Sequence, residues 1–522
     1  MSDRLHRNSL GDLLPRTAAR EPDRIALVYR DRRETYAQLN DSVNRTANAL
    51  AARGLRKGER LAILSRNNRA FVVVLLAAAR LGAILVPINF MLNAGEVAYI
   101  LEHSGATAMV VEGALVATAE TAIAQAALPI RLRGVIEEPD AAAAAGWETV
   151  TAWMAHDDAR EPMVEIADDD PLQLLYTSGT ESRPKGAMLA SRQFIAQYQS
   201  IIVDGEFSSD DIEIHSLPLY HCAQLHVFLL PDLVLGATSI LLPAPDPAIL
   251  LATIERERAT KLFCPPTIWI ALLRHPDFAT RDLSSLKKGY YGASIMPMEV
   301  IKELSARLPQ VRLYNCYGQT EMTPMATILK PDDQLRKLGS AGRACINVET
   351  RVVDDEDRPL PAGEVGEIVH RGPHVMLGYW NDPVKTAEAF RNGWFHSGDL
   401  GRMDDEGFLY VVDRKKDMIK TGGENVASRE VEEVIYQHPA VAEVAVFGIP
   451  HPRWIEAVMA VIVCKNGSNV TVEELTLFCR ERLAGYKAPK HFVLAEQLPK
   501  NASGKILKRE LRQAHIERAS AI

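Results

Sequence analysis

Short apolar runs alternate with longer segments of helical periodicity along the first two thirds of the chain. Arg60–Leu64 and Ala83–Pro87 predict strands, and Ala70–Leu81 between them predicts a helix. The order recurs where the strand-like run Lys261–Cys264 precedes the helical pattern Thr267–Leu273. This rhythm is typical of parallel sheets that are covered by helices. We therefore expect an α/β fold with a large N-terminal body of doubly wound sheets.

The pattern changes after Asn347. Glu349–Val353 and Glu364–His370 are short, β-like and bounded by Gly, Pro and Asp, which predicts a small antiparallel β subdomain. The charged run Asp413–Lys420 then precedes a tail, Val431–Gln513, that alternates helix and strand. Taken alone, the charged run also fits a solvated surface turn. We interpret it as a hinge between an N-terminal domain, 1–413, and a smaller, mobile α+β C-terminal domain, 414–522.

The composition narrows the class of protein. The 522 residues include 59 Lys and Arg and 67 Asp and Glu, a net charge of −8, which argues against broad nucleic-acid binding. The six cysteines form no CxxC pair, which fits a reducing compartment. The longest apolar run, Ala70–Ala79, is too short for a membrane span, and the N-terminal residues show no secretory pattern. We expect a cytoplasmic globular protein.

The segment Tyr176–Gly186, YTSGTESRPKG, carries the strongest chemical signal. It follows a predicted strand, and small hydroxylated residues leave backbone N–H groups free to surround phosphate oxygens. Lys185 adds a cation. The spacing differs from GxxxxGK[ST], so this is not a Walker A loop. A flexible surface turn would explain the segment if no other motif agreed with it.

Four further segments agree with a nucleotide site. Tyr314–Glu321 (YNCYGQTE) follows a predicted strand and offers a ring for a base and a carboxylate for Mg²⁺. Trp394–Asp399 (WFHSGD) ends in a carboxylate that can accept from ribose hydroxyls. Asp413–Asp417 (DRKKD) is the predicted hinge, and Leu498–Lys508 (LPKNASGKILK) presents Lys505 on a turn-rich loop.

These five segments, in this order, resemble the adenylate-forming enzyme superfamily, which includes acyl-CoA synthetases, aryl-CoA ligases, adenylation domains and beetle luciferase. The resemblance extends from about Leu13 to Leu511. It implies that a carboxylate attacks the α-phosphate of ATP to give an acyl adenylate and pyrophosphate. The C-terminal domain then rotates, and a thiol, usually that of CoA, attacks the acyl carbonyl. The implied cofactors are ATP, Mg²⁺ and coenzyme A.

The resemblance also implies roles for individual residues. ATP would be bound by Thr177, Ser178, Gly179, Thr180, Lys185, Gly292, Ala293, Tyr317, Gly318, Thr320, Asp399, Arg414 and Lys505. Mg²⁺ would be bound by Glu321, with Thr177. Lys505, Glu321 and His221 would be the catalytic residues, and Lys416 would be the pivot. CoA would contact Gly422, Gly423, Glu424, Trp454, Tyr486 and Lys487.

The acid pocket is assigned to the segment Leu217–Gln224, LPLYHCAQ, and its surroundings. In the related enzymes this segment is an acyl gate, so His221 would guard the carboxylate and shift between the two steps. The expected pocket residues are Tyr220, His221, His226 and Tyr291. A lone histidine such as His226 is also common as a hydrogen-bonded core residue.

Three departures from the family pattern stand out. Glu181 and Ser182 replace the Thr-Gly of TSGTTGxPKG, which predicts slower or weaker use of ATP. Tyr291 stands where Gly is common, which favours a short, medium or aromatic acid over a very long chain. Ile455 replaces the Gly of Trp-Gly-Glu near the expected thiol tunnel.

We predict an acid–CoA ligase that acts on a fatty or aryl acid. One alternative is an adenylating enzyme that delivers the acyl group to a carrier-protein thiol, an amine or another nucleophile. A second is a non-catalytic nucleotide-binding relative. The expected partners are small molecules, without nucleic acid, and the sequence leaves a homodimer open.

Overall fold

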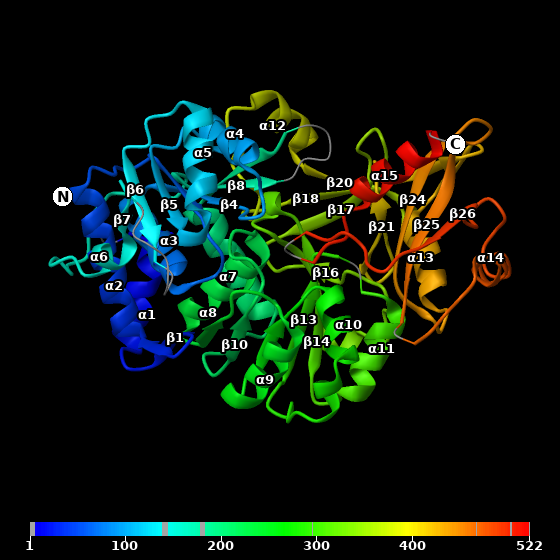
Figure 1. Cartoon of the computed structure of the whole chain (residues 1–522), viewed down its shortest axis with the longest axis horizontal. Coiled ribbons are helices and arrows are strands. Elements are labelled where there is room, and N and C mark those ends of the chain that lie inside the picture. The colour runs from blue at the N-terminus through cyan, green and yellow to red at the C-terminus, as the bar shows by residue number, and fades with distance from the viewer. Residues whose placement is uncertain are drawn as a thin grey trace.

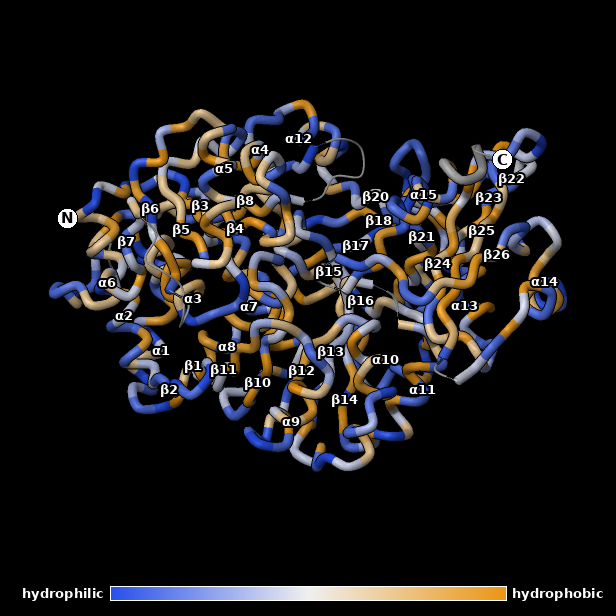
Figure 2. The backbone as a smooth tube through the Cα atoms, in the orientation of Figure 1, coloured by the Kyte–Doolittle hydropathy of each residue, from blue (hydrophilic) through white to orange (hydrophobic). Residues whose placement is uncertain are grey.

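The structure is a computed structural model. It describes residues 6–137, 145–177, 183–294, 296–465, 467–501 and 504–520, and for residues 517–520 it describes the backbone alone. Two large mixed sheets and a small antiparallel sheet form the N-terminal body, and a fourth sheet forms a separate C-terminal domain (Figure 1). Hydrophobic positions concentrate in the strands and in the helices packed on them (Figure 2). This arrangement confirms the α/β body, the β subdomain and the α+β tail that the sequence predicted.

The first sheet has eight strands in the order β19-β9-β8-β4-β3-β5-β6-β7. Its strands are β3 (Arg60–Leu64), β4 (Ile84–Ile88), β5 (Ala108–Glu112), β6 (Leu132–Ile136), β7 (Glu148–Thr149), β8 (Pro171–Thr177), β9 (Lys185–Ala190) and β19 (Gly378–Tyr379). Its neighbouring helices are α2 (Tyr36–Ala52), α3 (Arg69–Leu81), α4 (Ala94–Ser104), α5 (Val116–Ala126), α6 (Val150–Met154) and α7 (Ser191–Asp204). The strand β3 and helix α3 match their predicted ranges closely. The helix begins there because the Asn68 side chain accepts from the Phe71 N–H, and it ends at Gly82 in the left-handed conformation.

The second sheet has nine strands in the order β16-β15-β14-β13-β12-β10-β11-β1-β2. Its strands are β1 (Ile25–Tyr29), β2 (Arg32–Thr35), β10 (Ile212–His215), β11 (Thr238–Leu241), β12 (Lys261–Phe263), β13 (Lys288–Gly292), β14 (Arg312–Gly318), β15 (Met325–Leu329) and β16 (Arg343–Ala344). Its helices are α1 (Leu13–Arg20), α8 (Leu230–Leu235), α9 (Pro247–Glu257), α10 (Pro266–Arg274) and α11 (Met298–Arg307). Strands β10 to β14 are parallel, so their carboxyl ends open at one edge.

The small sheet is antiparallel, in the order β17-β18-β20-β21. Its strands are β17 (Glu349–Val353), β18 (Gly366–Arg371), β20 (Phe395–Met403) and β21 (Leu409–Arg414), and α12 (Pro383–Ala389) lies between β19 and β20 in sequence. The predicted strand Glu349–Val353 is confirmed residue for residue. A turn follows β21, in which the N–H groups of Asp417 and Met418 donate to the Arg414 carbonyl. This turn is the covalent link to the C-terminal domain.

In its described residues, the C-terminal domain packs three helices on a sheet in the order β23-β22-β25-β24, with β26 beside β25. The strands are β22 (Ile419–Thr421), β23 (Glu424–Val426), β24 (Val441–His451), β25 (Ile455–Cys464) and β26 (His491–Leu494), and the helices are α13 (Ser428–Tyr436), α14 (Val472–Arg480) and α15 (Lys508–Ser520). Among the residues that the structure describes, no helix has the length and apolar character that a bilayer crossing needs.

Candidate active site

A carboxylate with three polar partners marks the centre of the site. Asp399 on β20 accepts from the Tyr317 hydroxyl at 2.8 Å and from the Gln319 amide at 3.1 Å. The Arg414 guanidinium lies 3.4 Å away, because Asp399 and Arg414 are register partners on β20 and β21. Burial and the nearby Asp399 raise the pKa of Tyr317 far above its usual value, so its hydroxyl stays a donor. The structure thus joins three of the predicted ATP residues, and it adds Gln319.

The backbone beside Tyr317 is closely packed and constrained. A Cβ on Gly292 would lie 2.3 Å from the Cys316 carbonyl, and one on Gly318 would lie 1.8 Å from the Pro324 carbonyl, so both positions require glycine. Ala293 follows β13 with a φ of 63°. Gly292 and Ala293 at the end of β13, and Gly318 at the end of the adjacent β14, therefore stand where the parallel sheet opens.

Lys505 reaches this site from the C-terminal domain. The segment that precedes α15 extends back to the N-terminal body (Figure 1), where the Thr267 hydroxyl donates to the Gly504 carbonyl at 3.0 Å. The Lys505 side chain remains accessible to solvent, but protein atoms surround it on most sides. That burial, with Arg414 next in effect, lowers its pKa to about 8, although Asp399 and Asp417 oppose the shift. Lys416 contributes to the same positive field.

His221 lies close enough to Lys505 for the lysine charge to act on its ring. It precedes the π-helical segment Ala223–Leu229, and its Nδ1 accepts from the Ala223 N–H at 3.2 Å, which leaves the ring proton on Nε2. Burial, and then the charge of Lys505, lower the pKa of His221 to about 4, so the ring is neutral at pH 7. The Cys222 thiol lies 3.2 Å from the Thr320 hydroxyl and joins the His221 segment to the Thr320 segment.

Glu321 and Lys185 meet at a tyrosine that sequence reasoning missed. The Tyr379 hydroxyl donates to Glu321 at 2.8 Å, and the Lys185 ammonium lies 4.3 Å from the Tyr379 ring centroid. Tyr379 is on β19, which pairs with β9, the strand that begins at Lys185. Its only sequence signal was an aromatic residue after Gly378. Thr177 lies opposite Lys185 on β8, whereas Ser178, Gly179, Thr180, Glu181 and Ser182 are outside the described residues.

Two expected pocket residues point into the protein core. His226 is fully buried, and its ring nitrogens lie 2.8 Å from the Tyr198 hydroxyl and 2.8 Å from the Gln173 amide oxygen. Tyr291 is also buried, and its hydroxyl donates to Gln334 at 2.7 Å. Neither side chain has a free polar atom for a substrate, so the structure does not bring them to the site around Asp399 and Lys505. Tyr220 is partly exposed, with its ring edge against Phe90.

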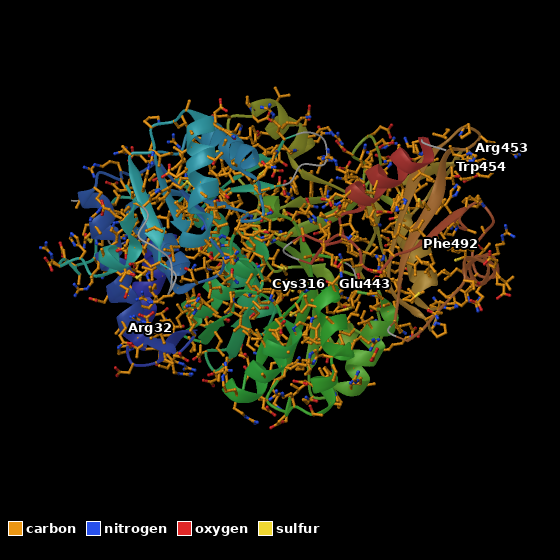
Figure 3. All side chains as sticks on the ribbon, viewed as in Figure 1. Arg32, Cys316, Glu443, Arg453, Trp454 and Phe492 are labelled. Carbon is orange, nitrogen blue, oxygen red and sulfur yellow. The ribbon has the colours of Figure 1, made fainter. Side chains whose placement is uncertain are left out.

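The residues expected near CoA lie elsewhere on the C-terminal domain. Gly422 and Gly423 form the turn between β22 and β23, and the Gly422 N–H donates to the Trp454 carbonyl at 2.9 Å. Trp454 stacks on His451 at the outer end of this domain, far from Cys316 on β14 (Figure 3). Glu424, Tyr486 and Lys487 are on the same domain, and Lys487 pairs with Glu430 at 2.6 Å. This arrangement does not place the CoA set beside Asp399.

A second polar cluster, which we call the buried cluster, consists of Lys261, Glu213, Asp232 and His215, all fully buried. Ligand atoms of its two carboxylates and its histidine lie within 4.8 Å of one another, as in some metal sites. However, the Lys261 ammonium already lies 2.5 Å from Asp232 and 2.8 Å from Glu213. The cluster therefore holds its own cation and is structural.

Comparisons with known proteins show which family the chain is similar to. Residues 14–380 match the AMP-binding enzyme family, and residues 430–505 match the AMP-binding enzyme C-terminal domain. A feruloyl-CoA synthase from Amycolatopsis sp is 39% identical over 98% of this chain and 99% of its own. A long-chain-fatty-acid–CoA ligase from Mycobacterium tuberculosis is 37% identical over 93% and 94%. The crystal structure of an anthranilate CoA ligase with anthranoyl-AMP superposes with a TM-score of 0.91, at 28% identity over 98% of both chains.

The fold, the cleft and these relatives define a class, the ligases that activate a carboxylic acid with ATP. The chain belongs to the AMP-binding enzyme family. Within it, the protein is an acid–CoA ligase, which forms a carbon–sulfur bond through an acyl adenylate and uses ATP and CoA.

Proposed function

We propose that this ligase acts on a compact aromatic acid rather than on a long-chain fatty acid. The observation that carries the proposal is a layer of buried aromatic rings in the core against which Tyr317 packs. Tyr290 stacks on Tyr314 at 4.7 Å, and Phe228 stacks on Phe263 at 4.2 Å. Tyr290 is the neighbour of the predicted Tyr291 but projects from the opposite face of β13 and packs in one cluster with Leu217 of the His221 segment. Closely packed rings leave little space for a long flexible chain.

The proposal is tested with a panel of acids that includes ferulate, anthranilate and palmitate, each incubated with ATP, Mg²⁺ and CoA. Thioester products are measured by mass, and kcat/KM is compared between acids. We expect the aryl acids to exceed palmitate by at least about 10²-fold. An optimum at palmitate would reject the compact pocket.

In the first step, the acid carboxylate attacks the α-phosphorus of ATP, a new P–O bond forms and pyrophosphate leaves. We infer that Lys505 and Arg414 offset the charge that collects between these two anions. Asp399 accepts from the ribose hydroxyls, and Tyr317 packs against adenine with Gly292, Ala293 and Gly318 nearby. Neutral His221 donates its Nε2–H to a carboxylate oxygen of the acid, and Thr320 contacts phosphate.

Glu321 fits a magnesium ion, because it offers a hard carboxylate oxygen next to Tyr379, the residue that Lys185 also contacts. Tyr379 orients that carboxylate, Lys185 contributes charge, and Thr177 lies on the adjacent strand. When bound, Mg²⁺ supplies charge neutralisation at the phosphates. Ser178, Gly179 and Thr180 remain proposed phosphate contacts.

In the second step, the CoA thiolate attacks the acyl carbonyl and AMP leaves. We infer that the C-terminal domain, 414–522, turns about Lys416 and withdraws Lys505. This motion would account for the distance between Asp399 and the set Gly422, Gly423, Glu424, Trp454, Tyr486 and Lys487. We also propose that the enzyme acts in the cytoplasm. Light scattering would decide whether it is a homodimer.

One observation favours a second candidate function, transfer to an acceptor other than CoA. Ile455 has a φ of 72°, a conformation that favours glycine, and its side chain is 68% exposed beside Trp454. A branched side chain there would narrow the approach of a thiol. If CoA is not the natural acceptor, Ile455→Gly raises thioester formation several-fold; an unchanged rate would exclude this explanation.

A further inference from the structure

Helix α13, the first helix of the C-terminal domain, contacts the N-terminal body through polar groups of its first two turns. These groups are Ser428, Arg429 and Glu433, and we call them the α13 clasp. None of them belongs to the proposed ATP, acid or CoA sites. Each has its partner on the other side of the turn 414–418, and each is described in full by the structure.

Ser428 hydrogen-bonds to the carboxylate of Asp413, at the end of the N-terminal body. Its N–H and its hydroxyl both donate to Asp413 Oδ2, at 2.7 and 2.8 Å. The Ser428 hydroxyl also accepts from the Lys508 ammonium at 2.7 Å, and Lys508 pairs with Glu432 at 2.8 Å. Because Lys508 begins α15 three residues after Lys505, the contact with Asp413 is connected directly to the loop that carries Lys505.

Arg429 joins two separate segments of the body. Its guanidinium donates to the Gly339 carbonyl at 3.2 Å and to the Val411 carbonyl. Its side chain is only 16% exposed, and burial lowers its pKa while Glu433 and Glu432 oppose that shift. A planar guanidinium can serve two carbonyls at once, which a lysine ammonium on its single flexible stem reproduces less well.

Glu433 lies one turn further along, 4.0 Å from Arg429. Burial raises its pKa, and the charge of Arg429 and a hydrogen bond from the Met298 N–H oppose that rise. Met298 is the first residue of α11, so the carboxylate meets the positive end of a body helix. The Arg429–Glu433 pair is therefore completed by groups of the N-terminal body.

We propose that the α13 clasp holds the C-terminal domain in the pose that forms the acyl adenylate, and that it must open before the thioester forms. Ser428, Arg429 and Glu433 are positioning residues, since they act on the reaction through the placement of Lys505. The proposal rests on the domain rotation proposed above. Any rotation about the turn 414–418 separates the clasp from Asp413, Val411, Gly339 and Met298, because these partners precede that turn.

The test separates the two half-reactions in the full-length enzyme. Adenylation is measured as acid-dependent ATP–pyrophosphate exchange, and the second step as thioester formation from synthetic acyl-AMP and CoA. We expect Arg429→Ala to lower adenylation about tenfold, since it removes buried hydrogen bonds of a charged group. The second step stays within about twofold of the wild-type rate or rises. Arg429→Lys should restore part of the adenylation rate.

The matched control is Arg482→Ala, which removes an arginine that contacts Phe478 and Glu481 near the end of α14. It should change neither half-reaction. Circular dichroism and the unfolding midpoint confirm that Arg429→Ala is folded. Equal losses in both steps, or no loss in either, would overturn the clasp. A further experiment cross-links the two domains of the wild-type enzyme in this pose. If the cross-linked enzyme carries out ATP–pyrophosphate exchange and also forms the thioester as fast as the free enzyme, the proposed rotation is overturned.

Discussion

The protein gathers charged side chains in two places, and the two clusters behave in opposite ways. In the buried cluster, Lys261 is neutralised by Asp232 and Glu213, and no group is exposed to solvent. In the cleft, Lys505, Arg414 and Asp399 come from elements that adjoin the domain boundary, and Lys505 stays accessible. One cluster contains its own counter-ion, and the other leaves positive charge for a ligand.

The difference lies in which elements supply the charges. The buried cluster comes from β10, β12 and α8, which all belong to the N-terminal body. The cleft takes Lys505 from a domain that is linked to the body by a short turn. Charges fixed within one core stabilise the fold, whereas a cation on a separate domain can be presented to two anions and then removed.

The largest effect should come from breaking the buried cluster. Lys261→Met leaves two buried carboxylates without their cation and should lower the free energy of unfolding by about 3–5 kcal/mol. Urea denaturation followed by fluorescence measures this change. Lys302→Met on the exposed face of α11 is the control and should change it by less than about 0.5 kcal/mol. A fully stable Lys261→Met protein would mean that the cluster does not need its ammonium.

The second-largest effect should come from removing Lys505, the cation that is left available for a ligand. Lys505→Ala should reduce adenylation by about 10²–10³-fold and leave the free energy of unfolding unchanged, because the removed cation serves the transition state. Pyrophosphate exchange and urea denaturation of one preparation test both halves. Lys500→Ala, on the same loop but paired with Glu443, is the control. Exchange that survives in Lys505→Ala would contradict the proposed role.

A smaller loss is expected when Asp399 is changed. Asp399→Asn keeps the size of the side chain but removes the charge that would strengthen the proposed hydrogen bonds from ribose hydroxyls, so KM for ATP should rise about tenfold or more. The KM for the acid should change little. A similar rise for both substrates would indicate a distorted cleft.

The smallest expected effect is a pH dependence that comes from the charge of Lys505. Below pH 8 Lys505 is protonated, and above this value it loses its charge, because its pKa is lowered to about 8. The kcat/KM for ATP in the adenylation step should therefore fall as the pH rises through 8, to roughly one tenth of the plateau at pH 9. Lys505→Arg should be less active but should lack this alkaline limb. An unchanged alkaline limb in Lys505→Arg would assign it to another group.

Hydrophobic periodicity predicted the elements of the body well. The strand Arg60–Leu64 and the helix that ends at Leu81 are where the pattern placed them, because burial of one apolar face fixes both the period and the ends. The motifs around Tyr317, Asp399 and Lys505 also predicted which residues meet. Tyr379, Gln319 and the α13 clasp were not predicted, since their partners are distant in sequence and their residue types are common on surfaces.

His226 and Tyr291 show most clearly what the sequence alone could not predict. Their positions in the chain suggested a pocket, but a strand alternates its side chains between two faces, and the packing of each face decides which one meets the cleft. By itself, the sequence determined the α/β architecture and the adenylate-forming chemistry, and it predicted the residues that we propose carry charge to it. Only the tertiary structure decided which charges are neutralised in the core and which stay available, because burial and ion pairing depend on neighbours that the order of residues does not reveal.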